Sequence, residues 1–459
     1  MTDADLIIIG AGPAGMAAAI SASEAGAKVI LLDEQQSAGG QIYRNVGSNH
    51  DGRSFLGEEY FEGLKLVEAL SRSNVKCEFG TTVWRIEDDL RVVWSRDGVS
   101  NISSARHVLL ATGAQERPAP FPGWELPGVM TAGAAQILMK SSRLLAKDAV
   151  LAGSGPLLYL VAVQLIKAGT PPIAIVETQT MKNAFKASRY LPRAMLASKM
   201  LAKGMELLRY IRKSGVSRYT SAKDFQAVQN DDGQLTFSFR TRKRVHQLVT
   251  PLVLSHQGVV SSTHISRSLG LAHEWNLSQQ AFLPIVDKWG RTKNSRIHIA
   301  GDGAGIGGAR AAIASGRIAV LDMLFQLGKL SDDQRNQSST ADRALLRQSL
   351  AIRPFLDALY YPPKEILAPS GETLVCRCEE IGASTIRQTL NQSGLGPRQI
   401  KSSTRSGMGP CQGRMCELPI QGILSSCGKK HLLPKVRTPI KPISLGELAS
   451  LAERPSTKS

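Results

Sequence analysis

Apolar residues near the start of the chain form two short runs separated by a helical pattern. Residues 5–10, DLIIIG, are typical of a buried strand, residues 16–27, MAAAISASEAGA, predict a helix, and residues 28–33, KVILLD, predict a second strand. Parallel strands need a crossover between them, which is usually a helix. The order therefore predicts a parallel βαβ unit at the start of the chain.

The same order of elements returns further along the chain. Residues 149–155 and 172–177 are strand-like, and residues 156–169 between them are helix-like. Before this repeat, residues 107–113, HVLLATG, predict a strand and a turn, and four prolines within residues 116–128 exclude regular structure. We therefore expect two nucleotide-type units, with a domain boundary in the proline-rich stretch.

The rest of the chain contains four further patterns. Residues 178–215 are rich in Lys, Arg, Met and Leu and predict one or two basic amphipathic helices, either a solvated face over the core or a membrane or partner surface. Residues 225–258 predict a small antiparallel layer around an Asp-Gly turn. Residues 296–324 predict a strand, a glycine-rich turn and a long helix, and the polar residues 330–343 predict a linker.

Length and composition exclude several classes of protein. A chain of 459 residues with 42% hydrophobic residues is long enough for two or three globular domains. The acidic start, MTDAD, does not resemble a secretory signal, and no apolar stretch reaches the roughly 20 residues needed to span a bilayer. The chain is expected to be soluble and cytoplasmic.

The net charge of +18 is compatible with nucleic acid, an acidic membrane surface, an acidic partner or anionic cofactors. The chain has no arginine-rich repeat, aromatic RNA-binding signature or recognition-helix pattern, so no nucleic acid is expected as a partner. Peripheral association with membrane acceptors, at the inner face of the cell membrane, stays open. So does a basic surface that serves solubility alone.

The first βαβ unit carries the fingerprint of a dinucleotide-binding site. Gly10, Gly12 and Gly15 stand as GAGPAG between the strand and the helix. They permit the tight turn, the backbone approach to a pyrophosphate and close helix packing, respectively. Asp33 ends the second strand 18 residues beyond the last glycine. Asp33, or Glu34 beside it, can accept hydrogen bonds from an adenosine ribose.

Two later segments resemble the glutathione-reductase-like flavoproteins. The strand and turn at Thr112 and Gly113 resemble the exit from the FAD domain, and IHIAGD resembles the motif whose aspartate, here Asp302, contacts the flavin's ribityl or phosphate region. Asp302 could instead cap the following helix. The resemblance implies that FAD, or another adenine nucleotide, is bound by Gly10, Gly12, Pro13, Ala14, Gly15, Asp33, Glu34, Gly40, Gln41, Arg44, Val83, Thr112, Gly113, Gly301 and Asp302.

The second unit has an incomplete fingerprint. Gly153 and Gly155 begin GSGPLL, and Leu158 replaces the third glycine, so helix and strand cannot approach as closely. Glu177 ends the next strand, where a ribose partner would stand. Three alternatives stay open: a vestigial or structural site, a bound nucleotide, and a working nicotinamide site.

Four of the six cysteines lie in two close pairs near the C-terminus. Cys376 and Cys378 form CxC, Cys411 and Cys416 form Cx4C, and 32 residues separate the pairs. Four thiolates are the ligands that a 2Fe–2S cluster requires, whereas structural zinc sites usually show CxxC spacings. We therefore predict a 2Fe–2S cluster on these four cysteines, with zinc or unligated thiols as the alternatives.

The two remaining cysteines lack a redox partner. Cys77 is the only cysteine before residue 370, so the disulfide chemistry of many reductases with this fold is excluded. Cys77 and Cys427 are predicted to be structural, and no catalytic residue is assigned to this chain.

The cysteine region resembles the bacterioferritin-associated-ferredoxin-like 2Fe–2S domain, in a Cx4C form familiar from domains fused to flavoproteins. Together with DEQQSAGGQIYR, PFPGWELPGVMTAGAAQ, GSGPLL and AGDGAGIGGA, it closely resembles the alpha (A) subunits of octopine- and nopaline-type opine oxidases. The alpha subunits of D-hydroxyproline dehydrogenase, dye-linked proline dehydrogenase and hydrogen cyanide synthase are similar too. The resemblance spans nearly the whole chain.

This resemblance implies an electron-transfer subunit. In the family, a FAD-containing beta subunit of the D-amino-acid or glycine oxidase type oxidises the C–N bond of the amine substrate. The alpha subunit receives the electrons, with FMN at the subunit interface in related complexes, and passes them through iron–sulfur centres to the respiratory chain. A small third subunit stays open. The alternatives are a self-contained NAD(P)H-dependent FAD/2Fe–2S oxidoreductase and a non-enzymatic scaffold.

The expected fold class is α/β, a two-dinucleotide-binding-domain flavoprotein of the glutathione-reductase type with a C-terminal bacterioferritin-associated-ferredoxin-like 2Fe–2S domain. The expected division of the chain is an FAD-binding domain in two parts (1–117 and 259–330), a second nucleotide-binding-like domain (118–258), a linker (331–370), the 2Fe–2S domain (371–430) and a basic C-terminal tail (431–459).

Overall fold

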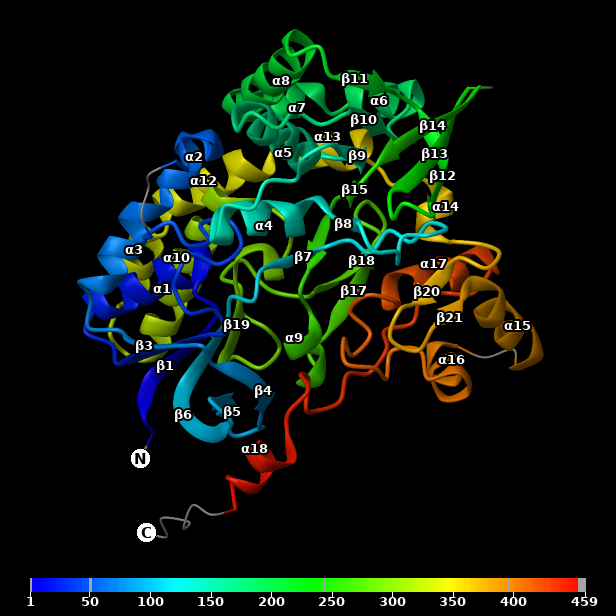
Figure 1. Ribbon diagram of the computed structural model, residues 1–459. Helices are drawn as coiled ribbons and strands as arrows, with labels where there is room; N and C mark the ends of the chain where they lie inside the picture. The colour runs from blue at the N-terminus through cyan, green and yellow to red at the C-terminus, as the bar shows by residue number, and fades with distance from the viewer. Residues whose placement is uncertain (1, 49–51, 243, 394–395, 453–459) are drawn as a thin grey trace.

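A seven-stranded, mostly parallel sheet underlies the first nucleotide unit (Figure 1). The computed structural model describes residues 2–48, 52–242, 244–393 and 396–452. The strand order is β3-β2-β1-β6-β5-β4, and β19 pairs in parallel with β6. The strands are β1 (Ala4–Ile9), β2 (Val29–Asp33), β3 (Lys76–Phe79), β4 (Thr82–Ile86), β5 (Arg91–Arg96), β6 (Val99–Leu110) and β19 (Ile297–Ile299).

The predicted βαβ unit is present as β1, α1 (Pro13–Glu24) and β2. Helix α1 packs against α10 (Ala309–Gln326), the long helix expected after β19. Their backbones meet closely, because a Cβ on Gly316 would lie 2.2 Å from the carbonyl oxygen of Ala14. Helix α3 (Gly63–Ser71) covers the same face of the sheet as α1. The buried side chains of this layer include Leu6, Ile8, Met16, Leu31 and Leu109.

The second nucleotide unit is a five-stranded sheet with an added antiparallel layer. Its strand order is β11-β10-β9-β15-β8, and the layer is β12-β13-β14. The strands are β8 (Val129–Thr131), β9 (Ala149–Ser154), β10 (Ala174–Glu177), β11 (Ser217–Tyr219), β12 (Ala222–Gln229), β13 (Leu235–Thr241), β14 (Arg244–Thr250) and β15 (Leu252–Gln257). The helices are α4 (Ala132–Ser142), α5 (Pro156–Lys167), α6 (Met181–Ser188), α7 (Leu191–Ala194), η2 (Met195–Ala197) and α8 (Ser198–Lys213).

The antiparallel layer is smaller than the sequence pattern suggested. We expected residues 225–258 to form one antiparallel layer, but β15 leaves it and joins the parallel sheet beside β9. The reason is burial: β15 is buried along almost its whole length, whereas β12 alternates buried and exposed positions. Strand β7 (Ala114–Glu116) and β16 (Val259–Ser261) then pair with each other where the chain crosses between the two sheets.

Residues 331–370 do not form the expected linker. They fold into α11 (Asp332–Ser338), α12 (Thr340–Leu350), α13 (Arg353–Leu359) and α14 (Lys364–Leu367). Ser331 and Gln334 form a capping box that starts α11. Helix α12 packs along α10, and α13 packs against α6. The polar composition concealed these helices because at most one side chain of each is fully buried.

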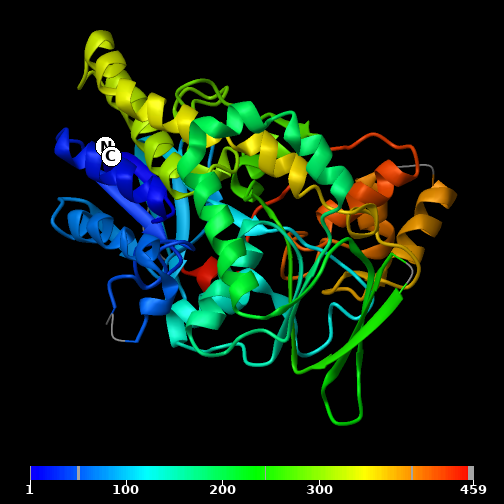
Figure 2. The same cartoon turned by 90° about the horizontal axis from the view of Figure 1, so that it is seen from above.

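The cysteine region is a separate small domain on the side of the molecule opposite α1 and α3 (Figures 1 and 2). It contains β20 (Leu374–Cys376), β21 (Ile381–Gly382), α15 (Ala383–Ser393), α16 (Pro397–Thr404) and α17 (Glu417–Ser426), around a core that includes Val375, Ile386, Ile400 and Ile423. Within the described residues, no helix has both the length and the apolar character needed to cross a bilayer.

The predicted C-terminal tail returns to the first sheet. Residues 431–452 run back from the cysteine domain, and the amide of Ile440 donates to the carbonyl oxygen of Trp84 at 3.0 Å. Helix α18 (Leu445–Ala449) lies beside β6, and the amide of Ser100 donates to the Ser450 hydroxyl at 2.9 Å. Residues 453–459 lie outside the described part of the chain.

A buried carboxylate ties α10, β19 and α11 together. Asp322 is fully buried and accepts hydrogen bonds from His298 at 2.8 Å, from Arg291 at 2.6 Å and from Arg335 at 2.8 Å. Burial alone would raise the pKa of Asp322, but the hydrogen bonds from His298, Arg291 and Gln326 outweigh burial and hold the pKa well below its usual range. Asp322 therefore remains ionised among its partners.

We expect Asp322→Ala to destabilise the first domain by about 3–5 kcal/mol, because it removes the buried carboxylate that His298, Arg291 and Arg335 share and leaves Arg291 and Arg335 only their more exposed partners. Urea denaturation followed by circular dichroism measures the change. Asp231→Ala, which removes an exposed aspartate, is the control and should shift the transition by less than about 0.5 kcal/mol. Equal shifts in the two variants would contradict the role assigned to Asp322.

Candidate cofactor sites

The predicted nucleotide residues gather at one edge of the first sheet. The glycine loop follows β1, Asp33 ends β2, Thr112 and Gly113 follow β6, and Gly301 and Asp302 follow β19. Because β1, β2, β6 and β19 are parallel, their carboxyl ends lie side by side. Open α/β sheets bind their ligands at this edge.

The glycine loop combines tight packing with an open surface. A Cβ on Gly10 would lie 2.4 Å from the carbonyl oxygen of Ala111, and a Cβ on Gly15 would lie 1.8 Å from the carbonyl oxygen of Gly10. A Cβ on Gly12 would meet only the Cα of Gly40, at 3.9 Å. The loop therefore leaves room directly above the start of α1, which fits a pyrophosphate at a helix N-terminus.

Asp33 is held in place by backbone amides. Its Oδ2 accepts a hydrogen bond from Ala11 at 2.5 Å, and its Oδ1 accepts one from Gln35 at 2.7 Å. Burial raises the pKa of Asp33, and the two amides offset only part of that rise. Since a carboxylate has about four lone-pair positions, Asp33 can still accept a ribose hydroxyl.

Glu34, the second candidate for the ribose, is engaged by the C-terminal segment. It forms an ion pair with Lys441, which lies 407 residues away in the sequence. Arg414 of the cysteine domain donates to the carbonyl oxygen of Ile440, next to Lys441, at 3.1 Å. No pattern in the sequence indicated this contact. Asp33 is therefore the better ribose candidate of the two.

Val83 stands beside Asp33 at the start of β4. The amide of Thr81 donates to the backbone carbonyl of Asp33 at 2.9 Å, which fixes the turn before β4 against the end of β2. The Val83 side chain is buried and lies opposite Trp94 on β5. A contact from Val83 to a nucleotide would therefore come from its backbone.

A buried lysine that the sequence did not reveal ties the turn after β2 to the second nucleotide unit. Lys140 on α4 donates hydrogen bonds to the carbonyl oxygens of Gln41 at 3.1 Å and Ile42 at 2.9 Å. Arg44 donates to the side chain of Gln41 at 2.9 Å and to that of Gln35. Burial lowers the pKa of Lys140 to about 7. A lysine inside a helix gives no signal in the sequence, because its partners come from another domain.

Asp302 holds the turn that precedes α10, but it does not cap the helix, because α10 has no side-chain cap. Its Oδ1 accepts hydrogen bonds from the amides of Gly307 at 2.8 Å and Gly308 at 3.0 Å, just before α10 begins. A Cβ on Gly308 would meet nothing within 4 Å, so this turn also faces open space. Thr112 donates to the carbonyl oxygen of Ser262 at 3.1 Å. The edge therefore has room for a ligand that extends from the glycine loop toward Asp302.

At the second fingerprint, the expected ribose partner is already occupied. Glu177 is fully buried and accepts hydrogen bonds from Tyr159 at 2.6 Å, Gln179 at 2.9 Å and Arg218 at 2.8 Å. The ring of Tyr360, from the helical segment that replaces the linker, lies 6.2 Å from that of Tyr159. A ribose could reach Glu177 only by displacing these side chains. Among the three alternatives, this arrangement favours a structural site.

The four predicted ligand cysteines converge in the cysteine domain. Cys376 forms a hydrogen bond with Cys416, and Cys378 forms one with Cys411, so each close pair takes one cysteine from each motif. The bond from Cys416 lowers the pKa of Cys376 to about 6, and the same bond raises the pKa of Cys416. The donor set is therefore four thiols in two pairs.

The surrounding backbone fits a cluster in two respects. The amides of Gly407, Glu379 and Cys378 donate to the sulfur of Cys376, which favours its thiolate form. A Cβ on Gly409 would lie 2.3 Å from the Cβ of Cys378, so only a glycine lets the backbone pass this close to that cysteine. Among the described residues, no three His, Cys, Asp or Glu side chains lie close enough together to bind one metal ion. A 2Fe–2S centre instead spreads four sulfurs over two irons.

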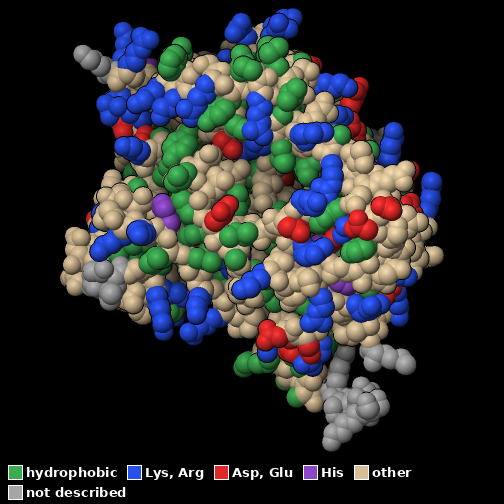
Figure 3. Space-filling model, turned by 180° about the vertical axis from the view of Figure 1, so that it is seen from behind, with side chains coloured by type: hydrophobic (Ala, Val, Ile, Leu, Met, Phe, Trp, Pro, Cys, Tyr) green, Lys and Arg blue, Asp and Glu red, His purple; other side chains and the backbone are tan. Residues whose placement is uncertain are grey.

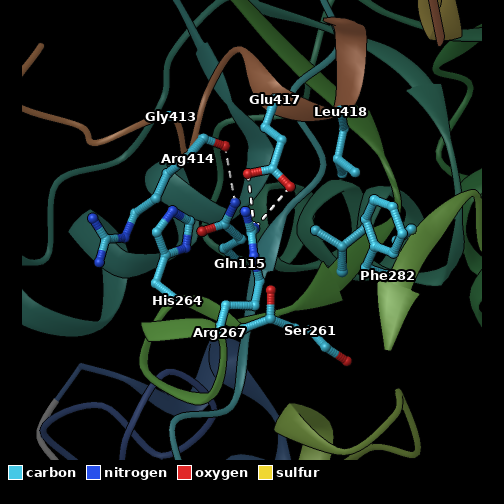
Figure 4. Close-up of a pocket in the computed structure, with 12 residues that line it drawn as sticks. Gln115, Ser261, His264, Arg267, Phe282, Gly413, Arg414, Glu417 and Leu418 are labelled. Carbon is cyan, nitrogen blue, oxygen red and sulfur yellow. Dashed lines mark hydrogen bonds and ion pairs between the residues drawn. The ribbon is translucent and has the colours of Figure 1, made fainter. Parts of the chain in front are cut away.

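The loop between α16 and α17, which carries Cys411 and Cys416 and is called the cysteine loop below, contacts the first unit around a small pocket (Figure 4). Arg267, on α9 (His264–Ser268), donates to Glu417 at 2.7 Å and 2.8 Å. His264 bonds to the carbonyl oxygen of Gln412 at 3.1 Å. Burial and the charges of Arg414 and Arg267 lower the pKa of His264 to about 3, so its imidazole is neutral and Nε2 donates. These contacts join distant segments, so sequence patterns did not reveal them.

The same pocket adjoins the edge of the first sheet. Gln115, on β7, donates to the carbonyl oxygen of Arg414 at 3.1 Å, and Ser261, on β16, donates to the backbone carbonyl of Asp302 at 2.6 Å. Both side chains line the pocket. The cysteine loop and the Asp302 turn are therefore joined through a few ordered residues of the β7–β16 pair and α9.

Two family models match the chain. Residues 4–316 match the pyridine nucleotide-disulphide oxidoreductases, and residues 374–426 match the BFD-like 2Fe-2S binding domain. The A subunit of opine oxidase from Agrobacterium tumefaciens (strain Ach5) is 42% identical over 464 residues, which covers 97% of this chain and 92% of the relative. The chain belongs to the family of opine oxidase A subunits.

One further relative and one solved structure are also similar to this chain. Hydrogen cyanide synthase subunit HcnB of Pseudomonas protegens is 32% identical and covers 89% of both chains. The crystal structure of L-proline dehydrogenase from P. horikoshii matches with a TM-score of 0.68 at 18% identity, over 97% of this chain and 79% of that one. At that identity, the likeness shows the fold alone.

The comparisons confirm several predictions for this member of the opine oxidase family. The predicted fold, a two-dinucleotide-binding-domain flavoprotein with a C-terminal 2Fe–2S domain, is confirmed, as is its class, a flavin-dependent oxidoreductase. FAD and a 2Fe–2S cluster are the cofactors of these two domain types. FMN, and the assignment of individual residues to each cofactor, stay predictions.

Gly12→Ala tests the nucleotide assignment. Gly12 has φ −75° and ψ −176°, which alanine adopts without strain, and its Cβ would point into open space. We therefore expect the variant to fold normally but to lose about tenfold of its bound FAD or other adenine nucleotide, because the methyl group takes the place of the pyrophosphate. Chromatography of the released cofactor measures this. Gly204→Ala, at an open helix position, should keep the cofactor content of the wild type.

The second fingerprint should not support NAD(P)H oxidation. Because Glu177 is held by Tyr159 and Arg218, we expect stopped-flow mixing with NADH or NADPH to leave the flavin absorbance unchanged. The same sample treated with dithionite provides the positive control. Rapid flavin bleaching by either nucleotide would contradict this prediction and support the self-contained reductase.

Proposed function

We propose that this chain is the electron-transfer alpha subunit of a heteromeric opine dehydrogenase of the octopine or nopaline type, or of a D-amino-acid dehydrogenase. A FAD-containing beta subunit of the D-amino-acid or glycine oxidase type oxidises the substrate C–N bond. This chain accepts the electrons, with FMN at the subunit interface, and passes them to a respiratory acceptor at the inner face of the membrane. HcnB and the opine oxidase relative, both named as subunits, support the heteromeric assembly.

One observation carries the proposal: the cysteine loop is docked onto the edge of the first sheet. His264 and Gln115 hold backbone carbonyls of residues 412 and 414, and Arg267 holds Glu417. Arg267 and Glu417 are largely buried, and breaking such a pair is costly because it leaves an uncompensated charge. The two cofactor sites of one chain are thus kept in a fixed relation, as an electron relay requires.

In this proposal the cofactors transfer the electrons, and the chain binds and positions the cofactors. When bound, the flavin accepts an electron pair, and the 2Fe–2S cluster transfers single electrons. The glycine loop and Asp33 provide the phosphate and ribose contacts, and the backbone amides at Cys376 stabilise thiolate. These are binding and positioning roles, so no side chain of this subunit needs to exchange a proton with the substrate.

Three buried or half-buried arginines of this subunit are engaged internally. Arg117 donates to the backbone carbonyls of Gln279 and Gln280, Arg218 pairs with Glu177, and Arg267 pairs with Glu417. A carboxylate-bearing substrate such as an opine needs a cation that can bind it in a bidentate manner, and these three guanidinium groups already have partners. These three arginines are therefore not free to bind a substrate carboxylate.

Cys378→Ser tests the relay. We expect the reduced wild-type chain, purified without oxygen, to show a 2Fe–2S electron paramagnetic resonance signal and about two irons per chain. In Cys378→Ser both should fall at least tenfold. Cys427→Ser is the matched control, since Cys427 is also exposed, and it should keep the signal.

The same variants can be assayed after assembly with the beta subunit. Octopine should then reduce an artificial acceptor in the wild type and in Cys427→Ser but not in Cys378→Ser, and the isolated chain should oxidise no opine. Opine oxidation by the isolated chain, or zinc in place of iron, would sink the proposal.

A further inference from the structure

A helical excursion, residues 181–213, projects from the second nucleotide unit between β10 and β11. It consists of α6, α7, η2 and α8 and lies at the top of Figure 1, facing the viewer in Figure 2. A crossover between neighbouring parallel strands needs only one helix, so this excursion is longer than the sheet requires. Its surface therefore has to be explained separately from the fold.

The excursion presents many large apolar side chains to solvent, and its fully buried apolar side chains are three alanines and Ile211. Ala187, Ala194 and Ala197 face the interior. The exposed fractions are 82% for Met181 and Phe185, 64% for Met195 and 63% for Leu196, and Leu191, Met200 and Met205 are exposed as well. Single exposed apolar residues are common, but eight within one segment, Tyr210 included, exceed scattered exposure and indicate an interaction site.

The same surface is strongly basic. Glu206 is the only acidic residue of the segment, against nine basic ones: Lys182, Lys186, Arg189, Arg193, Lys199, Lys203, Arg209, Arg212 and Lys213. On α6, Met181 and Phe185 lie four positions apart on one face and Lys182 and Lys186 lie four positions apart on the adjacent face, so basic side chains flank the apolar ones. At the top of Figure 3, Lys and Arg side chains are interleaved with hydrophobic ones.

We propose that residues 181–213 form the surface by which the protein docks on a membrane that contains anionic lipids. The apolar side chains enter the boundary between headgroups and acyl chains, and the flanking lysines and arginines reach the lipid phosphates. The contact is peripheral, since no helix of the described residues can span a bilayer. Its placement beside a respiratory acceptor rests on the proposed function, but the docking itself does not.

Charge favours a lipid surface over a protein partner as the occupant. Protein interfaces are depleted of lysine, particularly at their centres. Here Lys182 and Lys186 adjoin the two most exposed apolar side chains of the excursion, Met181 and Phe185. A layer of anionic headgroups can pair with many basic side chains at once, whatever their spacing, and the attraction adds up over the cluster. The positive charge and the exposed apolar side chains are thus both complementary to an anionic lipid surface.

Vesicle flotation of the full, cofactor-loaded chain tests the proposal. The wild type should float with vesicles of phosphatidylcholine containing phosphatidylglycerol and should stay at the bottom with phosphatidylcholine alone. Phe185→Ser/Leu196→Ser should reduce the floated fraction about tenfold. Lys182→Glu/Lys186→Glu should reduce it too, and added salt should weaken wild-type binding.

The matched control is Leu277→Ser/Leu445→Ser, which removes two apolar side chains that are 73% and 86% exposed elsewhere on the surface. It should float like the wild type. The proposal is overturned if the wild type ignores anionic vesicles, or if the control loses binding as much as Phe185→Ser/Leu196→Ser does. It is also overturned if added beta subunit prevents flotation, because a protein would then cover the excursion.

The iron–sulfur signal of each variant separates this result from the proposed function. Phe185→Ser/Leu196→Ser should keep the wild-type signal and the wild-type rate of octopine-driven dye reduction in solution. A wild-type chain that binds vesicles but shows neither the iron–sulfur signal nor dye reduction would fault the relay and leave the docking surface standing.

Discussion

The whole arrangement depends on a close approach of three backbone segments at the carboxyl edge of the first sheet. The turn after β1 touches the end of β6 at Ala111, and the start of α1 touches that turn, so neither Gly10 nor Gly15 can carry a side chain. This contact points the open start of α1 at the ligand and leaves space above Gly12. Asp33 ends β2, and Thr112 and Asp302 follow β6 and β19 of the same parallel sheet, so the rest of the site lies at the same edge.

A second constraint couples this edge to the cysteine domain. Four side chains lie between Asp302 and the cysteine loop. They come from the β7–β16 pair and from α9, and they are Gln115, Ser261, His264 and Arg267. The C-terminal segment adds a further contact, the ion pair of Lys441 with Glu34. The small domain is thus anchored by a largely buried ion pair and by backbone carbonyls, which a surface salt bridge alone would not achieve. Such anchoring suits a subunit that holds two redox groups at fixed positions.

The second nucleotide unit keeps the parallel sheet of a nucleotide-binding fold, although side chains of the chain itself occupy its expected ribose partner, Glu177. Leu158 and the engaged Glu177 are both fully buried, and Tyr360 packs beside Tyr159 from a segment whose polar sequence predicted a linker. The unit retains its parallel sheet and adds the basic helical excursion on its outer side. Its Lys140 holds the turn after β2 of the first unit by hydrogen bonds to two backbone carbonyls.

Features that depend on neighbours in the sequence could be predicted: the glycine spacing, the first βαβ unit, the acidic residue ending β2 and the two cysteine motifs. Local sterics and strand or helix periodicity determine these, so the fold and the candidate residues followed from them. Only the tertiary structure decided that Cys376 lies next to Cys416, that Lys441 neutralises Glu34, that Arg218 occupies Glu177 and that residues 331–370 are helical. The three pairs join segments that are far apart in the chain, and the helices of residues 331–370 are stabilised by packing on α10 and α6, so none of these features is decided by neighbours in the sequence.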